Sequence, residues 1–181
     1  MDQKTSSSVT QAPTKEFVIS RRFDAPRDLV FRLWTDPEHM RRWWGPKGFQ
    51  VIHSKLDLHP GGLYHYGMRS ADGHPMWGKF VFREIVKPER LVFVNSFSDE
   101  KGNVNRHPMH LSWPLEMLST ISFIEQVGKT TVTVSWLPLN PTEEERRTFE
   151  AGFDSMTQGW GGTFEQLGEY LTKLGEASGK S

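Results

Sequence analysis

Gly159-Trp160-Gly161-Gly162-Thr163-Phe164-Glu165-Gln166-Leu167-Gly168-Glu169-Tyr170-Leu171 is the stretch that decides the fold. It closes a longer pattern in which large apolar residues recur at steps of three and four: Phe149, Phe153, Met156, Trp160, Phe164, Leu167, Leu171 and Leu174. Such steps place the side chains on one face of an α-helix. A single helix over residues 142–174 would be roughly 50 Å long at ~1.5 Å per residue. A helix this long and aromatic needs a broad apolar surface to lie against.

The sequence before this helix supplies strands. Runs typical of strands occupy residues 17–23, 49–58, 63–69, 76–86, 91–97, 118–127 and 130–137. Short turns such as Pro60-Gly61-Gly62 and Gly128-Lys129 separate most of them, as an antiparallel meander requires. Two short helices are expected between the first two strands. We therefore predict an α+β fold, in which about six to seven antiparallel strands have one apolar face covered by the long helix.

Composition narrows the class of protein. The chain has 181 residues, and its 22 basic residues balance 22 acidic ones, so nothing favours a nucleic-acid partner. It contains no cysteine, which fits a reducing compartment, and we expect a cytoplasmic protein. No apolar run approaches the length of a membrane span, so no integral membrane association is expected. We predict a disordered tail over residues 1–15, a single domain over 16–175 and a frayed C-terminus over 176–181.

Metal and nucleophilic chemistry find little support. His53, His59 and His65 are six residues apart, which is neither the i, i+2 spacing usual for a ligand pair on a strand nor the i, i+3 or i+4 spacing of a pair on a helix, and His107 and His110 lie in a proline-bounded loop. The chain has no Gly-x-Ser-x-Gly elbow and no cysteine nucleophile. We therefore expect no metal, no cofactor and no catalytic residue.

The order of elements and a set of short motifs resemble a known family. The motifs are Phe23-Asp24-Ala25-Pro26, Trp34-Thr35-Asp36-Pro37, Trp43-Trp44-Gly45-Pro46, Asp57-Leu58-His59-Pro60-Gly61-Gly62, residues 68–73, Arg83-Glu84-Ile85, Pro88-Glu89-Arg90-Leu91 and residues 159–171. In this order they resemble the activator of heat-shock-protein-90 ATPase homologue-like family of the START-related, or SRPBCC, superfamily. The resemblance implies the helix-grip fold, a curved antiparallel sheet wrapped round a long C-terminal helix with an apolar cavity between them. It does not imply one activity, since most members with this pattern are bacterial and biochemically undefined.

Three functions stay open for such a cavity. The first is binding of a small apolar or amphipathic molecule, for which we predict the lining Tyr64, Tyr66, Met68, Phe80, Phe82, Phe153, Met156 and Trp160. The second is an enzyme of the cyclase, dehydratase or hydrolase type, with His65, Glu84 or Tyr66 turned into the cavity. The third is a chaperone-associated interaction module, suggested only by the family name. Fold does not decide among them, and the sequence also leaves a homodimer open.

One segment is longer than its role in a meander requires. Residues 98–117 join two strands that a few residues could connect, and they carry Met109, Leu111 and Trp113. We call this segment the connector. It is either a flap over one mouth of the cavity or a packed surface loop.

Overall fold

The computed structural model describes residues 12–179. Most of the predicted tail, residues 1–11, and the last two residues lie outside the described part. The elements in chain order are β1 (Phe17–Phe23), α1 (Arg27–Thr35), α2 (Pro37–Trp43), β2 (Phe49–Leu56), β3 (Leu63–Ser70), β4 (Pro75–Val86), β5 (Arg90–Ser98), β6 (Val104–Asn105), β7 (Met117–Gln126), β8 (Lys129–Pro138), α3 (Glu143–Ala151) and α4 (Phe153–Ser178).

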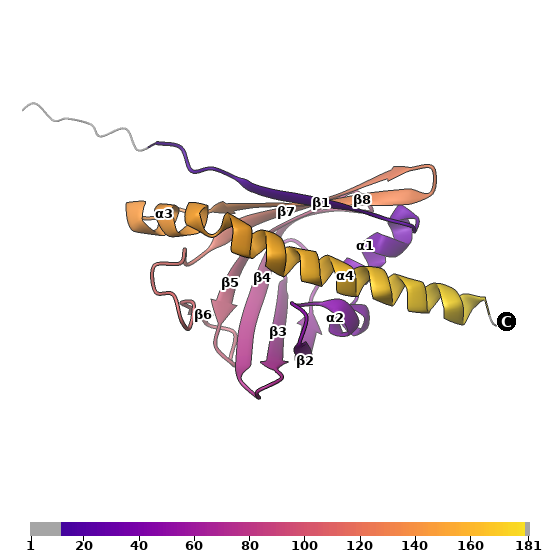
Figure 1. Ribbon diagram of the computed structural model, residues 1–181, viewed down its shortest axis with the longest axis horizontal. Helices are drawn as coiled ribbons and strands as arrows, with labels where there is room; N and C mark the ends of the chain where they lie inside the picture. The colour runs from indigo at the N-terminus through magenta and orange to yellow at the C-terminus, as the bar shows by residue number, and fades with distance from the viewer. Residues whose placement is uncertain (1–11, 180–181) are drawn as a thin grey trace, which may run out of the picture.

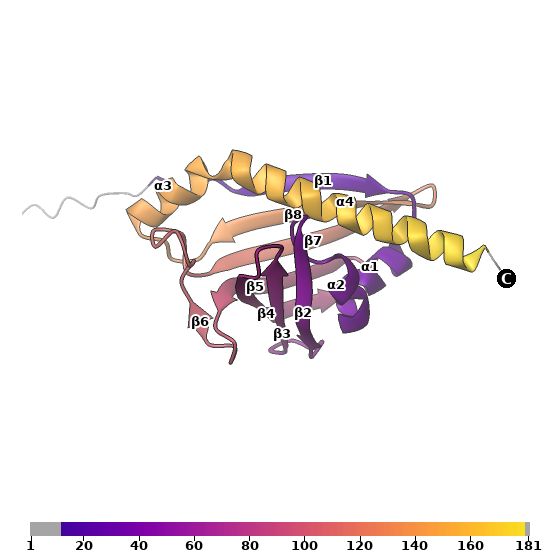
Figure 2. The ribbon, with the colours of Figure 1, turned by 60° about the horizontal axis from the view of Figure 1, so that its bottom comes forward.

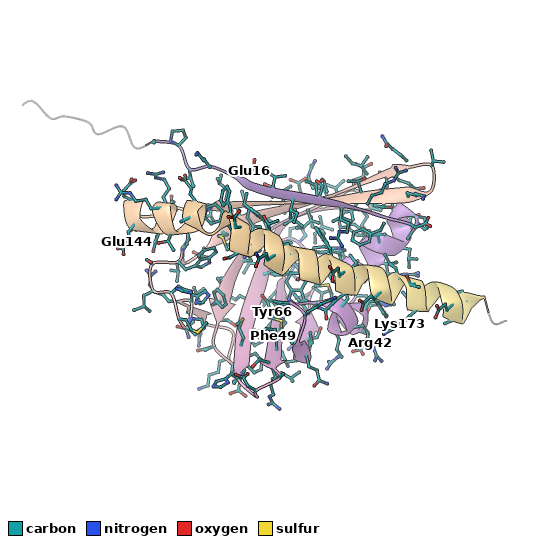
Figure 3. All side chains as sticks on the ribbon, in the orientation of Figure 1. Glu16, Arg42, Phe49, Tyr66, Glu144 and Lys173 are labelled. Atoms are coloured by element: carbon teal, nitrogen blue, oxygen red, sulfur yellow. The ribbon has the colours of Figure 1, made fainter. Side chains whose placement is uncertain are left out.

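The strands form one antiparallel sheet that faces the C-terminal helices. Their order is β1-β8-β7-β5-β4-β3-β2, and the short β6 pairs with β5. Figures 1 and 2 show α3 and α4 running along one face of the curved sheet, with α1 and α2 beside α4. In Figure 3, Glu144 and Lys173 mark the two ends of this helical layer. The predicted α+β helix-grip architecture is confirmed.

The C-terminal helix is not continuous, which corrects the prediction of one helix over residues 142–174. It breaks at Gly152, which ends α3 and precedes α4. A Cβ atom at Gly152 would lie 3.2 Å from the Trp113 ring of the connector, so the ring packs closely on the break. The predicted start is right, because Thr142 caps α3 in a capping box with Glu145. At the other end, α4 continues to Ser178.

The core lies between the sheet and α4. Met156, Trp160, Phe164 and Leu167 of α4 are buried, whereas Phe153 is only half-buried. Two tryptophans from the first half of the chain meet this helix, since the rings of Trp34 and Trp44 lie 6.2 Å and 5.8 Å from the Trp160 ring, centroid to centroid. None of the helices in residues 12–179 combines the length and apolarity that a membrane crossing requires.

Candidate functional site

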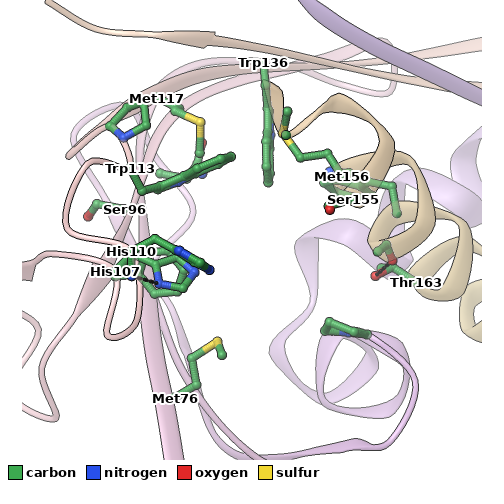
Figure 4. Close-up of a pocket in the computed structure, with 18 of the residues that line it drawn as sticks. Met76, Ser96, His107, His110, Trp113, Met117, Trp136, Ser155, Met156 and Thr163 are labelled. Atoms are coloured by element: carbon green, nitrogen blue, oxygen red, sulfur yellow. Dashed lines mark hydrogen bonds between the residues drawn. The ribbon is translucent and has the colours of Figure 1, made fainter. Parts of the chain in front are cut away.

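The structure contains a pocket of about 680 Å³ between the sheet and the helical layer. Its floor is formed by side chains of the sheet, among them Tyr66, Phe80 and Asn95. The antiparallel register places Tyr66 opposite Gly78 and Phe80 opposite Asn95 on neighbouring strands. Its roof is the stretch of α3 and α4 between Thr148 and Thr163. Figure 4 shows Trp113, His107 and His110 on one side of the open centre, with Ser155, Met156 and Thr163 of α4 on the other. The pocket therefore lies between the sheet, the helices and the connector.

Aromatic rings form much of the wall at the end away from the connector. The Trp44 ring meets Phe80 at 5.2 Å and Trp160 at 5.8 Å, and Trp136 of β8 meets Trp160 at 5.5 Å. The indole N–H groups of Trp44 and Trp136 are buried without a hydrogen-bond partner among residues 12–179. They are covered by their neighbours and add no polar contact to the pocket surface. This wall therefore offers flat apolar area to a ligand.

The connector closes the other end and is anchored to α3. Arg106 pairs with Glu145 at 2.9 Å, and the Thr148 hydroxyl donates a hydrogen bond to the Ser112 hydroxyl at 3.0 Å. Burial of Glu145 acts to raise its pKa, but the hydrogen bond from the Thr142 N–H and the Arg106 guanidinium outweigh it and lower the pKa. The carboxylate is thus charged at neutral pH and holds the connector by a half-enclosed ion pair.

Comparison with known proteins identifies the family. Residues 24–172 match the model of the family described as Activator of Hsp90 ATPase homolog 1-like protein. The chain belongs to this family. No curated protein matches the sequence.

Solved structures share the fold of this Hsp90 ATPase activator homologue-like chain. A crystal structure from Mycobacterium smegmatis has a TM-score of 0.71 at 23% identity, over 87% of this chain and 91% of that chain. A structure from Nitrosomonas europaea has a TM-score of 0.68 at 24% identity, over 89% and 96% of the two chains. A solution structure from Arthrobacter aurescens has a TM-score of 0.72 at 26% identity, over 87% and 86%. These likenesses support the fold and name no ligand.

The structure separates the eight residues predicted to line the cavity. Tyr66, Met68, Phe80, Met156 and Trp160 border the pocket together. The other three lie outside its lining.

Each of these three residues has a packing role. Tyr64 is fully buried, and its hydroxyl lies 3.2 Å from the Ser54 hydroxyl. Phe82 packs on Phe93 at 5.8 Å, and Phe153 packs on Phe17 at 5.6 Å. They face the same side of the sheet or helix as the lining residues but meet other side chains there.

Sequence reasoning missed several lining residues of this family member. Trp136 was visible in the alternation of β8, which places Val132, Val134 and Trp136 on one face. Met117 is the first residue of β7 and lies just before the predicted strand, which began at residue 118. His107, His110 and Trp113 come from the connector, and the path of a loop carries no periodic signal.

The groups considered for catalysis do not gather in the pocket. His65 stacks on Trp77, and its Nε2 atom lies 3.2 Å from the Asp99 carbonyl oxygen. Glu84 forms an ion pair with Arg90. Of these three groups, only Tyr66 borders the pocket. Burial raises the pKa of Tyr66 to about 12. The nearby Trp44 indole acts to lower this pKa, although its N–H is not in hydrogen-bond geometry with the phenol. The Tyr66 phenol is therefore neutral at pH 7.

The charge inside the pocket is also low. Among the described residues that line it there is no Lys, Arg, Asp or Glu. Within residues 12–179, no group of three His, Asp or Glu side chains lies close enough together to hold a metal ion. The polar side chains in the lining are the Asn95 amide, the two connector histidines and the hydroxyls of Tyr66, Ser96, Thr148, Ser155 and Thr163.

Proposed function

We propose that this protein binds a small apolar or amphipathic molecule in the pocket between the sheet and α4, without turning it over. The observation that carries the proposal is the lining itself. A space of about 680 Å³ is bordered by aromatic and methionine side chains, with a few polar groups among them. This is the usual make-up of a small-molecule site.

The energetics favour an apolar ligand. A ligand that loses roughly 200 Å² of apolar surface in the pocket gains about 5 kcal/mol at ~25 cal/mol per Å², before the cost of immobilisation. Met68 and Met156 add polarisable, adaptable contacts. Apart from the connector, the walls stand on regular strands and helices, which limits the reorganisation on binding.

Binding ranks above catalysis because only one of the three groups considered for catalysis, Tyr66, borders the pocket. A general base must be within hydrogen-bond reach of its proton and have a pKa near the working pH. The raised pKa of Tyr66 makes it a poor base at neutral pH, and His65 and Glu84 are outside the lining. The cytoplasmic location belongs to this proposal, since the chain has no cysteine. A chaperone contact and a homodimer stay predictions.

A titration with N-phenyl-1-naphthylamine, an uncharged probe whose emission rises in apolar surroundings, tests the proposal. We expect saturable binding to the wild type and a loss of binding in Met156→Trp, since Met156 borders the pocket and an indole there would fill it. Met109→Trp is the matched control, because Met109 is 77% exposed on the connector and outside the lining. It adds the same side chain without filling the pocket.

The outcomes separate cleanly. Absent binding to the wild type, or equal binding by the two tryptophan variants, would overturn the pocket as a ligand site. Native mass spectrometry of the purified protein would add the identity of any molecule carried through purification.

A further inference from the structure

His107 is held with a defined proton position. Its Nδ1 atom accepts hydrogen bonds from the backbone N–H of Met109 at 3.0 Å and of His110 at 3.2 Å. A backbone N–H can only donate, so Nδ1 must carry its lone pair there. In a neutral imidazole the single proton then lies on Nε2. The local turn therefore fixes the tautomer.

His107 is also one of the residues that line the pocket. The ring packs between Phe97, at a centroid distance of 4.7 Å, and His110 at 4.8 Å. It borders the pocket, and within residues 12–179 its Nε2 atom makes no hydrogen bond. Burial, and then the neighbouring His110, lower the pKa of His107. At neutral pH the ring is thus an uncharged donor at Nε2, and it has no free acceptor with which to act as a base.

The rest of the lining restricts what this donor can meet. No lysine, arginine, aspartate or glutamate in the described chain lines the pocket, so a charged ligand group would lose its hydration without gaining a counter-ion. The opposite wall is built of rings, among them Trp44, Phe80 and Trp160, which suit a flat aromatic body. An uncharged ligand with one strong acceptor fits both conditions.

We propose that the Nε2–H of His107 donates a hydrogen bond to the carbonyl oxygen of an uncharged aromatic ligand whose ring system lies against the aromatic wall. This inference deepens the proposed function and rests on it. It assigns the ligand to the aromatic ketones, esters or amides and excludes fatty acids and other carboxylates. His107 is the group that sets this specificity.

Displacement of bound N-phenyl-1-naphthylamine by three naphthalenes tests the assignment. 2-Acetylnaphthalene carries the carbonyl, 2-ethylnaphthalene replaces it with a methylene group, and 2-naphthoate adds a charge. The measured quantity is the ratio of the acetyl and ethyl inhibition constants, compared between the wild type and each variant. This comparison cancels the difference in hydration between the two compounds.

His107→Asn is the informative variant. The asparagine Oδ1 can still accept the backbone N–H groups at residues 109 and 110, as asparagine does in Asx turns, but no donor reaches the Nε2 position. We expect this variant to shift the ratio toward the ethyl compound by roughly three- to tenfold, the range for one net hydrogen bond. His110→Asn, the same substitution in the neighbouring ring, should leave the ratio within about twofold of the wild type. 2-Naphthoate should displace the probe poorly from the wild type and from both variants.

A second readout reports on the hydrogen bond itself. The carbonyl ¹³C resonance of labelled 2-acetylnaphthalene should lie further downfield in the wild-type complex than in the His107→Asn complex. Equal ratios and equal ¹³C shifts in the two proteins would overturn the assignment while leaving the pocket intact, and so would a shift confined to His110→Asn. Strong competition by naphthoate would overturn the uncharged class. Failure of every naphthalene and of the probe to bind would overturn the proposed function together with this inference.

Discussion

Two glycines in neighbouring strands lie under aromatic rings on opposite faces of the sheet. The register of β3 and β4 pairs Gly78 with Tyr66 and Gly67 with Trp77. A Cβ atom at Gly78 would overlap the Tyr66 hydroxyl and lie 2.5 Å from its Cζ atom, and one at Gly67 would lie 2.7 Å from Cζ3 of Trp77. Alanine at either position therefore pushes a ring away from the sheet. Only Tyr66 would move into the pocket, since Trp77 is not part of its lining.

The two alanine variants should lose similar stability. Forcing a methyl group under a packed ring costs about 1–3 kcal/mol, and replacing glycine by alanine in a strand returns about 0.5–1 kcal/mol by restricting the unfolded chain. The net loss is about 1–2 kcal/mol for Gly78→Ala and for Gly67→Ala. With a urea slope of about 2 kcal/mol/M, each denaturation midpoint should fall by roughly 0.5–1 M.

Ligand binding should separate the two variants. Moving the Tyr66 ring by about 1 Å to reach an ordinary contact distance would displace a bound probe from roughly 50 Å² of apolar wall, which is worth about 1.3 kcal/mol or about tenfold in Kd. We expect Gly78→Ala to weaken binding of N-phenyl-1-naphthylamine by that factor and Gly67→Ala to leave it within about twofold. Equal probe affinity of the two variants, with both folded, would refute the placement of Tyr66 at the pocket.

Three further predictions concern the rest of the chain. Val127 is 96% exposed at the β7–β8 turn and has a φ of 51°, a conformation that asparagine adopts more readily than valine. Val127→Asn should therefore raise the free energy of unfolding by about 1 kcal/mol in urea titrations, and an unchanged or lower midpoint contradicts this. Arg106→Met removes the partner of the enclosed Glu145 carboxylate, so hydrogen exchange of the backbone amides across residues 106–115 should become faster. Exchange rates as slow as in the wild type would show that the ion pair does not hold the connector. The pKa of His107 is lowered from 6.5, so its folded form binds fewer protons than the unfolded form, and its contribution to stability should fall as pH drops below about 6.5. His53 acts with the same sign and His59, whose pKa is raised, with the opposite sign, so the contribution of His107 is the part of the slope of stability against pH that His107→Asn removes.

The helical period predicts which face of the C-terminal helices is buried but not where they break. The step from Phe149 to Phe153 keeps the apolar period across Gly152, so the pattern continues through the break. Glycine at position 152 indicates that another group packs closely there, but it does not indicate which one. In the structure that group is the Trp113 ring from the connector. A contact between segments so distant in the chain is tertiary information that a local pattern does not contain.

The alternation of the strands has a similar limit. It correctly places Tyr66, Met68 and Phe80 on the inner face of the sheet, and it places Tyr64 and Phe82 there by the same rule. Whether an inward side chain borders a void or fills the core depends on what stands opposite. Tyr64 is fully buried with its hydroxyl beside Ser54, whereas Tyr66, two residues further along, reaches the open pocket. The sequence pattern therefore assigns a face, and only the packing of other elements assigns a depth.

The connector shows how an unusual length can indicate a function before any residue does. Its excess over a hairpin turn predicted an element at the mouth of the cavity, and the structure uses it as one wall. The two roles considered for it, flap and packed loop, are not exclusive here. Its links to α3 include one ion pair, one hydroxyl contact and the packing of the Trp113 ring on Phe149, whereas Met109 and Leu111 stay exposed. A ligand that enters the pocket is therefore expected to pass the connector, and His107, the donor that we assign to the ligand carbonyl, lies on the element that it passes.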